Sequence, residues 1–415
     1  MQRKILGYLF IRFNLLLVLV FIISAFTYNI TPRKIFYGDL SEIIFENEVL
    51  QVEKIGSIPR LAVSYNINGD IYATEDHYTF KNTEGSNYFL ELGNFYKTDP
   101  NLFEKVKDFI ARLRSIRKIR KNFGANDIVV LESGTILVFY DKIYRSSDNG
   151  TSFEEVYDFK DNDMYSPLSH GIAVNKNNDI YFGEYNCGPR PHKISIVKGS
   201  KDGTVWSEFY NFPSGELFHI HSIKYDNYRD TLWVSTGDLD EESKLIQINA
   251  ENGDINIVGF GDQGWRAVSL IITENFLYWC SDNDRTGSNI YKYDFSTGER
   301  TKIKSIGKPG YYATKLKDGT LVISTAYEPI SPYSKSYNLQ PTADLWVSEN
   351  GSDWHKILSL QGKIYETEYG PSRASIILPD GDYSSNYLFL TPEDTLNSDF
   401  STLVLKITWK EQTVQ

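Results

Sequence analysis

The chain has 415 residues, of which 41% are hydrophobic and 14% are aromatic. This composition supplies enough apolar surface for a sizeable core and excludes an intrinsically disordered protein. The formal net charge of −11 excludes a general nucleic-acid binder, because phosphate contacts need a basic face.

The first 30 residues carry an export signal. Basic residues precede an apolar run of twelve residues, Leu15–Phe26, which is the arrangement of a signal-peptide hydrophobic region. No small-residue cleavage pattern follows Phe26, so residues 1–30 are predicted to stay as a membrane anchor, with a cleaved signal peptide as the alternative. We therefore expect the rest of the protein outside the cytoplasm, anchored to the membrane or secreted after cleavage. Residues 31–48 are predicted to be a linker, and residues 410–415 a tail.

One pattern, two apolar strands joined by a tight polar turn, recurs within residues 49–409. Its seven copies begin at Arg60, Asn126, His170, His221, Arg266, Tyr312 and Arg373. The four middle starts are 51, 45 and 46 residues apart, which is the length of one four-stranded antiparallel blade. The sequence therefore predicts an all-β fold, a seven-bladed β-propeller. The segment 49–58 precedes the first copy and is predicted to close the ring as the outer strand of blade seven.

The wide gap after the first copy holds an insertion of a different kind. Phe103, Val106, Ile110 and Leu113 recur at helical spacing, which predicts a short amphipathic helix in blade one. Its Lys/Arg cluster is interpreted as a solvated face, with a polyanion-binding patch as the alternative.

A polar segment, RSSDNGTSF at residues 145–153, lies between the third and fourth expected strands of blade two. Weaker copies, GSKDGTVW at 199–206 and VSENGSDW at 347–354, lie at the equivalent places in blades three and six. Asp148 can accept backbone hydrogen bonds, Gly150 can take a positive φ, and Phe153 can anchor the turn in the core. In the weaker copies Lys201 and Glu349 are taken to replace the aspartate, so we expect those turns to be held differently.

The pattern Ser146-x-Asp148-x-Gly150-x-Ser152-Phe153 resembles the Asp-box, or BNR repeat, of sialidase-like β-propellers. The resemblance covers residues 60–409. It implies a secreted or surface propeller whose Asp-box turns are structural and lie on the face opposite the active site. Propellers of this kind include glycoside hydrolases, lyase-like enzymes, sorting receptors and assembly factors, so the resemblance does not select one chemistry.

Polar residues gather where the inner strands begin and the second strands end, two places that share one face of a propeller. The strand starts are the seven residues given above, and His219 lies two positions before His221. The strand ends offer Glu75, Asp76, Asp141, Glu184, Tyr185, Asp238, Asp282 and Tyr327. We predict a ligand-binding mouth on this face, with a water-filled polar channel as the alternative.

Three chemistries are compatible with this mouth. In a sialidase-like hydrolase, Arg60, Arg266 and Arg373 would clamp a substrate carboxylate. The catalytic set would be Glu184, Asp238 and a tyrosine nucleophile, either Tyr312 or Tyr327. The remaining substrate-binding candidates are His170, Tyr185 and Asp282.

In the second chemistry, His219 and His221 share one side of a strand and hold a divalent cation with His170, Glu184 or Asp238. Such a cation suits a polysaccharide lyase or hydrolase, and a packed histidine pair is the alternative. In the third, the mouth is a non-catalytic surface for carbohydrate or protein, on which tyrosines stack. The sequence thus predicts a membrane-anchored, glycan-binding propeller with glycoside hydrolysis as the leading reaction. Binding or assembly and metal-assisted lysis remain open, and no cofactor is predicted beyond a divalent cation.

Overall fold

The computed structural model describes residues 32–38, 41–96, 125, 127–186, 188, 192–283, 285–329, 339–363, 366–367, 370–371, 373–382 and 384–411. The expected membrane segment in residues 1–30, the expected helix after residue 102 and the strand start Asn126 lie outside these residues. No helix within the described ranges is long and apolar enough to cross a membrane.

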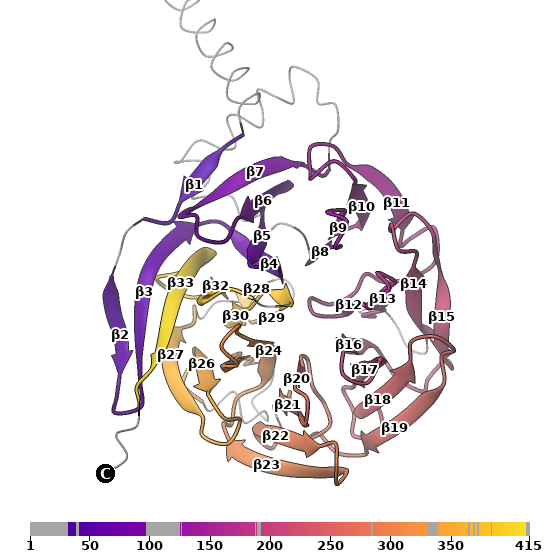
Figure 1. Cartoon of the computed structure of the whole chain (residues 1–415). Coiled ribbons are helices and arrows are strands. Elements are labelled where there is room, and N and C mark those ends of the chain that lie inside the picture. Colours follow the sequence, from indigo (N-terminus) through magenta and orange to yellow (C-terminus); the bar gives the residue numbers. More distant parts are fainter. Residues whose placement is uncertain are drawn as a thin grey trace, which may run out of the picture.

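Seven antiparallel sheets follow one another around a central axis, which confirms the seven-bladed β-propeller (Figure 1). Blade one contains β4 (Ala62–Ile67), β5 (Asp70–Glu75), β6 (Tyr78–Asn82) and β7 (Tyr88–Asn94). Blade two contains β8 (Asp127–Val130), β9 (Ile136–Phe139), β10 (Lys142–Ser146) and β11 (Glu154–Asp158). Blade three contains β12 (Ile172–Val174), β13 (Ile180–Gly183), β14 (Ile194–Gly199) and β15 (Trp206–Phe212).

The next three blades repeat this order from the axis outward. Blade four contains β16 (Ile220–Asp226), β17 (Thr231–Thr236), β18 (Lys244–Asn249) and β19 (Ile255–Phe260). Blade five contains β20 (Ile271–Ile272), β21 (Phe276–Cys280), β22 (Asn289–Asp294) and β23 (Glu299–Ser305). Blade six contains β24 (Gly310–Lys315), β25 (Leu321–Thr325), β26 (Thr342–Ser348) and β27 (His355–Gln361).

Blade seven joins the two ends of the described chain. Its strands are β30 (Ser375–Ile377), β32 (Tyr387–Glu393), β33 (Ser401–Trp409) and β3 (Leu50–Pro59). The register of β3 on β33 runs antiparallel from Leu50↔Trp409 to Pro59↔Ser401, so a strand from before the first repeat completes the last blade. Strand pairing thereby closes the ring and leaves no open sheet edge at the seam.

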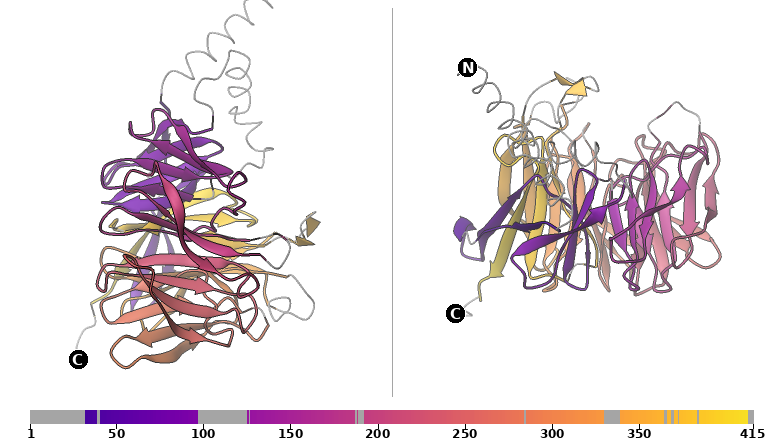
Figure 2. Two further views of the ribbon diagram at one scale, coloured as in Figure 1. Left: turned by 90° about the vertical axis from the view of Figure 1, so that its right-hand side faces the viewer. Right: turned by 90° about the horizontal axis from the view of Figure 1, so that it is seen from above.

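Short strands extend two of the sheets. On the outer side of blade one, β1 (Lys34–Phe36) pairs with β7, and on the outer side of blade seven, β2 (Glu42–Glu46) pairs with β3. A two-residue strand, β31 (Asp380–Gly381), adds to the inner side of blade one, parallel to β4. The hairpin of β28 (Glu366–Thr367) and β29 (Gly370–Pro371) projects from one face of the ring (Figure 2).

The hydrophobic core lies between neighbouring blades. Second strands such as β9 and β13 are buried at every position, because a blade packs on each of their two sides. Trp233 of blade four and Trp279 of blade five are fully buried in one shared cluster. Large aromatic side chains of this kind bury the most apolar area per residue, and so they hold successive blades together.

The three polar turns lie between third and fourth strands. Asp148 accepts hydrogen bonds from the Ser152 backbone N–H (2.9 Å) and hydroxyl (2.6 Å), and Gly150 has a φ of +85°. In the weaker copies the corresponding acceptors are Asp202, which binds the Thr204 N–H at 3.2 Å, and Asn350, which binds the Ser352 N–H at 2.8 Å. The assignment of Lys201 and Glu349 to this position was therefore wrong. In both turns the acceptor stands one residue nearer to the glycine than in blade two.

Candidate functional site

The face on which the inner strands begin holds a cavity of about 510 Å³, here called the mouth cavity. Its walls come from the starts of β4 and β24, the end of β32, and the loop before β12. The lining residues are Ala62, Val63, Ser64, Thr74, Ala125, Tyr165, Ser166, Pro167, Leu168, Ser169, Tyr185, Tyr312, Ile377, Glu393 and Phe400. The cavity thus lies on the face where the sequence predicts a binding mouth.

A compact cluster of two imidazoles and a carboxylate lies on the same face in blade four. One ligand atom each from His219, His221 and Asp238 lies within 4.8 Å of the other two. The two imidazole Nε2 atoms are 2.9 Å apart, and a carboxylate oxygen of Asp238 is 3.4 Å from the Nε2 of His219 and 3.9 Å from that of His221. Tyr185 connects the cluster to the mouth cavity, because its ring stacks on His219 at 4.1 Å and also lines the cavity.

Local backbone geometry brings these side chains together. His219 precedes β16, and the register between β16 and β17 shifts at His221, which marks a β-bulge that redirects its side chain. Asp238 follows β17 after Gly237, which has a φ of +154°. A Cβ at Gly237 would lie 3.0 Å from Cγ of Arg266, so the glycine lets the chain pass close to that side chain.

Arg266 sets the charge balance of the cluster. Its guanidinium nitrogen NH2 lies 2.9 Å from Asp238 and 2.8 Å from Asp282. Burial alone would raise the pKa of Asp238, but the hydrogen bond with His219 and the charge of Arg266 hold it well below its usual value. Burial, His219 and Arg266 together lower the pKa of His221 far below its usual value. Asp238 is therefore ionised and His221 neutral near pH 7, which are the states that metal ligands need.

His219 is oriented by the backbone. Its Nδ1 faces the carbonyl oxygen of Asn186 at 3.1 Å, so Nδ1 donates a proton to that oxygen and Nε2 is the ring nitrogen that faces the cluster. Asn186 itself is buried, and its side-chain Nδ2 has no hydrogen-bond partner among the described residues.

The structure places the other sequence candidates around the axis. Glu184 is buried and accepts hydrogen bonds from the backbone N–H groups of Tyr165 (3.0 Å) and Ser195 (2.6 Å). Tyr312 lines the mouth cavity, and its ring lies 5.1 Å from that of His170. Tyr327 is buried, and its backbone pairs with Ala374.

The three candidate arginines have different surroundings. Arg266 bridges blades four and five through Asp238 and Asp282. Arg373 is half exposed, and its guanidinium lies 3.7 Å from Glu328. Arg60 stands in the turn between β3 and β4 with a φ of +63°, and its backbone N–H bonds to the carbonyl oxygen of Phe400. The residues that meet in one place are thus His219, His221, Asp238, Arg266, Asp282 and Tyr185.

Glu393 is a site residue that the sequence reasoning missed. It ends β32 and lines the mouth cavity, and it accepts a hydrogen bond of 3.0 Å from the hydroxyl of Ser375. Burial, supported by the charges of Asp394 and Asp399, raises the pKa of Glu393 to about 7. Its position, the end of the second strand of blade seven, is equivalent to Asp238 and Asp282. The rule that selected those two would have found it.

Comparison with known proteins identifies structures of similar fold. No protein-family model matches the sequence, and no curated protein sequence matches it. The oligogalacturonate lyase of Vibrio parahaemolyticus is similar in structure, with 9% identity and a TM-score of 0.53 over 91% of this chain and 98% of that chain. An oligogalacturonate lyase in complex with manganese gives 10% identity and a TM-score of 0.53 over 92% of this chain and 98% of the other.

A third similar structure belongs to a longer protein. The extracellular domain of a one-component system of B. thetaiotaomicron gives 12% identity and a TM-score of 0.47 over 91% of this chain. This chain spans only 40% of that structure. At 9–10% identity the two lyase structures show a similarity of fold alone, and the chemistry has to be argued from the site itself.

Proposed function

We propose that this protein binds a divalent cation through His219, His221 and Asp238 and acts on an acidic oligosaccharide as a metal-assisted polysaccharide lyase. The observation that carries the proposal is the cluster itself. Two buried imidazole Nε2 atoms point at each other at 2.9 Å, with a carboxylate oxygen beside them. Imidazole and carboxylate ligands together suit zinc, manganese or iron better than calcium, which prefers oxygen ligands alone.

Formal charges explain why the substrate should be acidic. Asp238, Asp282 and Arg266 together leave one net negative charge when the histidines are neutral. A bound divalent cation reverses that sign, and so the occupied site attracts a carboxylate. The ring of Tyr185 stacks on His219 and also lines the mouth cavity of about 510 Å³, which has room for sugar residues.

A lyase removes a proton next to the sugar carboxylate and forms a C=C bond as the glycosidic C–O bond breaks; the departing oxygen takes up a proton, and no water is consumed. The cation would neutralise that carboxylate and so make the neighbouring C–H more acidic. Glu393 is the group in the mouth cavity that is suited to take the proton, because a pKa of about 7 leaves much of it ionised at neutral pH. The fold similarity to oligogalacturonate lyases, one of them determined with manganese, supports this choice of reaction class.

Glycoside hydrolysis is the second candidate, and Glu393 favours it as well. A carboxyl group with a pKa near 7 is partly protonated and can donate a proton to a leaving oxygen. Tyr312 lines the same cavity at the place expected of a sialidase-like nucleophile, but burial and the charge of Glu393 raise the pKa of its hydroxyl far above the usual value, which works against that role. Asp238 is unsuited to the acid role because its pKa is held low.

Two further parts of the proposal concern ancestry and location. The three hydrogen-bonded turns around Asp148, Asp202 and Asn350 support membership of the Asp-box propellers. The basic and apolar sequence of residues 1–30 supports export and attachment to a membrane.

Product analysis of the full chain tests the reaction class. The chelator-treated protein is incubated with uronate-containing and neutral oligosaccharides, with and without added Mn²⁺. Cation-dependent appearance of an unsaturated, ultraviolet-absorbing product from the uronate substrate would support lysis. New reducing ends without unsaturation, unaffected by chelation, would establish hydrolysis instead. Binding without any product would leave a recognition role and refute both enzymatic readings.

A further inference from the structure

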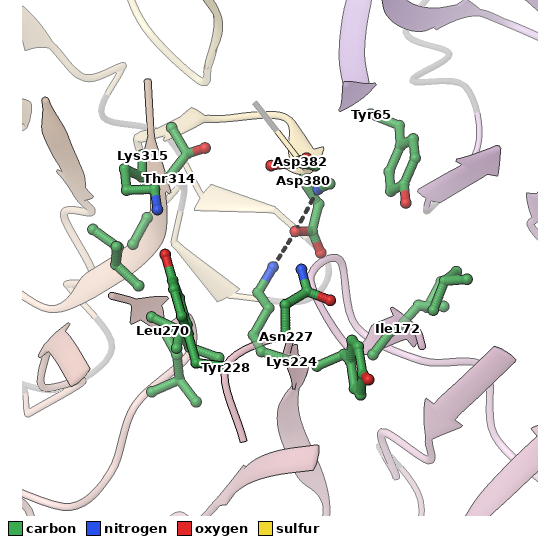
Figure 3. Close-up of a pocket in the computed structure, with 17 residues that line it drawn as sticks. Tyr65, Ile172, Lys224, Asn227, Tyr228, Leu270, Thr314, Lys315, Asp380 and Asp382 are labelled. Atoms are coloured by element: carbon green, nitrogen blue, oxygen red, sulfur yellow. Dashed lines mark hydrogen bonds and ion pairs between the residues drawn. The ribbon is translucent and has the colours of Figure 1, made fainter. Parts of the chain in front are cut away.

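A second cavity opens on the opposite face of the ring, where the inner strands end. It measures about 540 Å³ and is here called the rear cavity (Figure 3). Because strands alternate in direction within each blade, this is also the face of the three polar turns. Its lining residues are Tyr65, Ile172, Ala173, Val174, Lys224, Tyr225, Asn227, Tyr228, Leu270, Ile271, Ile272, Ala313, Thr314, Lys315, Asp380, Gly381 and Asp382. None of them belongs to the metal cluster or the mouth cavity.

One wall of the rear cavity is a segment of blade seven that crosses over to blade one. Between β30 and β32 the chain pairs with β4 of blade one, where Asp380 lies opposite Tyr65. Gly381 has a φ of +94°, and a Cβ there would collide with the carbonyl oxygen of Asn66. The Asp380 carboxylate forms an ion pair with Lys224 of blade four. Its strand pairing with blade one and its ion pair with blade four fix this wall in position.

The charged groups of the rear cavity divide into a paired and an unpaired set. Lys224 and Asp380 neutralise each other, and both side chains are largely buried. Lys315 and Asp382 also line the cavity, and within the described part of the chain neither has an ion-pair partner. Figure 3 shows Lys315 and Thr314 on one side of the cavity, Tyr65 on the opposite side, and Asp380 and Asp382 between them.

The unpaired charges restrict the ligand. Lys315 is partly buried and Asp382 is exposed at the rim of the cavity. A ligand that fills the cavity therefore displaces part of the water around both charges, which is unfavourable unless the ligand replaces that solvation. A neutral sugar replaces it only with hydroxyl groups, and a simple anion or cation serves one of the two charges while repelling the other. A ligand with one carboxylate and one ammonium serves both.

We propose that the rear cavity binds a small zwitterion of the amino-acid class. Its carboxylate pairs with Lys315 and its ammonium with Asp382. Apolar surface from Ile172 and Leu270, and the half-exposed ring of Tyr228, take up the ligand's side chain. This site is independent of the proposed reaction at the mouth, and its ligand carries no sugar.

Calorimetric titration of the full chain tests the proposal. The probes are free L-leucine and L-phenylalanine, the same amino acids with acetylated amines and amidated carboxyls, and glucose. We expect the free amino acids to bind and the blocked forms to bind at least about tenfold more weakly, the factor that 1.4 kcal/mol represents. Equal binding of free and blocked forms, binding of glucose alone, or no binding of any probe would overturn the proposal.

Variants locate the binding. Lys315→Met and Asp382→Asn should each weaken binding of the free amino acid at least about tenfold, whereas Lys317→Met should leave it unchanged. Lys317 is a matched control, because it is exposed near the same strand end and its ion-pair partner among the described residues is Glu84, at 3.5 Å. Chelator treatment and His221→Ala should not alter this binding, so failure here is distinguishable from failure of the metal site.

Discussion

Removing one imidazole from the blade-four cluster should remove most of the stabilisation that a divalent cation gives the folded protein. At a free cation concentration about 100 times the dissociation constant, binding adds about 2.7 kcal/mol to the free energy of unfolding. A propeller of about 360 residues has an unfolding entropy of about 0.8 kcal/mol per kelvin at its melting temperature. The unsubstituted protein should therefore gain about 3–4 °C in melting temperature when Mn²⁺ or Zn²⁺ is added after chelator treatment.

His221→Ala leaves two of the three donors, His219 and Asp238. Loss of a group that merely supports a ligand weakens metal binding by about 10–100-fold, so loss of a ligand should reach at least about 100-fold. The added stability at the same cation concentration then falls to about 0.4 kcal/mol, a shift of about 0.5 °C. His355→Ala is the control, since His355 packs against Trp409 at the outer edge of the ring.

Differential scanning calorimetry of the three proteins, with and without cation, measures these shifts. The reasoning is refuted if the unsubstituted protein shows no shift with Mn²⁺ or Zn²⁺. A full shift in His221→Ala would equally reject the assignment, because the cation would then bind elsewhere.

Three further predictions concern stability. Asp148→Ala should lower the free energy of unfolding by about 1–2 kcal/mol in urea denaturation, because two hydrogen bonds from Ser152 are lost; an unchanged midpoint would contradict this. Gly381→Ala should cost about 2 kcal/mol or more from its positive φ and its collision with Asn66, whereas a neutral effect in the same assay would show that the crossing segment is not fixed. Burial raises the pKa of Asp127 to about 7, so the folded protein holds a proton that the unfolded chain releases near pH 4. This proton contributes up to about 4 kcal/mol to the free energy of unfolding below pH 4, and the contribution is lost as the pH rises to 7. In Asp127→Asn, the curve of unfolding free energy against pH should therefore be flatter between pH 4 and 7.

The ring was predictable because its signal is periodic. Each blade packs an inner and a second strand against its neighbours. The same pattern of apolar strands therefore recurs at regular spacing in the sequence, as it does from His170 to His221, Arg266 and Tyr312. Contacts that occur only once, and are not repeated from blade to blade, produce no periodic pattern in the sequence. The pairing of β31 with β4 and the ion pair of Arg33 with Glu75 join segments far apart in sequence, and no local pattern announces either.

The candidate site was predictable to the level of its residue types. Strand ends and starts selected Asp238, Asp282, Arg266 and His221, and these meet in the structure. What the sequence lacked was the direction of each side chain. An arginine at a strand start can face a ligand carboxylate or a carboxylate of its own chain. The structure shows that Arg266 lies between two aspartates of its own chain, Asp238 and Asp282.

His170 shows how the same rule selects a residue of the scaffold. The carbonyl oxygen of Leu378, 2.8 Å from Nε2, can only accept, so Nε2 must carry the proton. Nδ1 then accepts, and it faces the Ser269 hydroxyl at 2.9 Å and the Lys224 ammonium at 3.5 Å, both of which are donors. Burial, with the charge of Lys224 adding to it, lowers the pKa of His170 to about 4, so the imidazole is neutral at pH 7 and both nitrogens are occupied by protein groups. These partners come from blades four, five and seven, so one imidazole of blade three is hydrogen-bonded to three other blades. The hydrogen-bonded layer around His170 therefore lies between the mouth cavity and the rear cavity and is supplied by the ring itself.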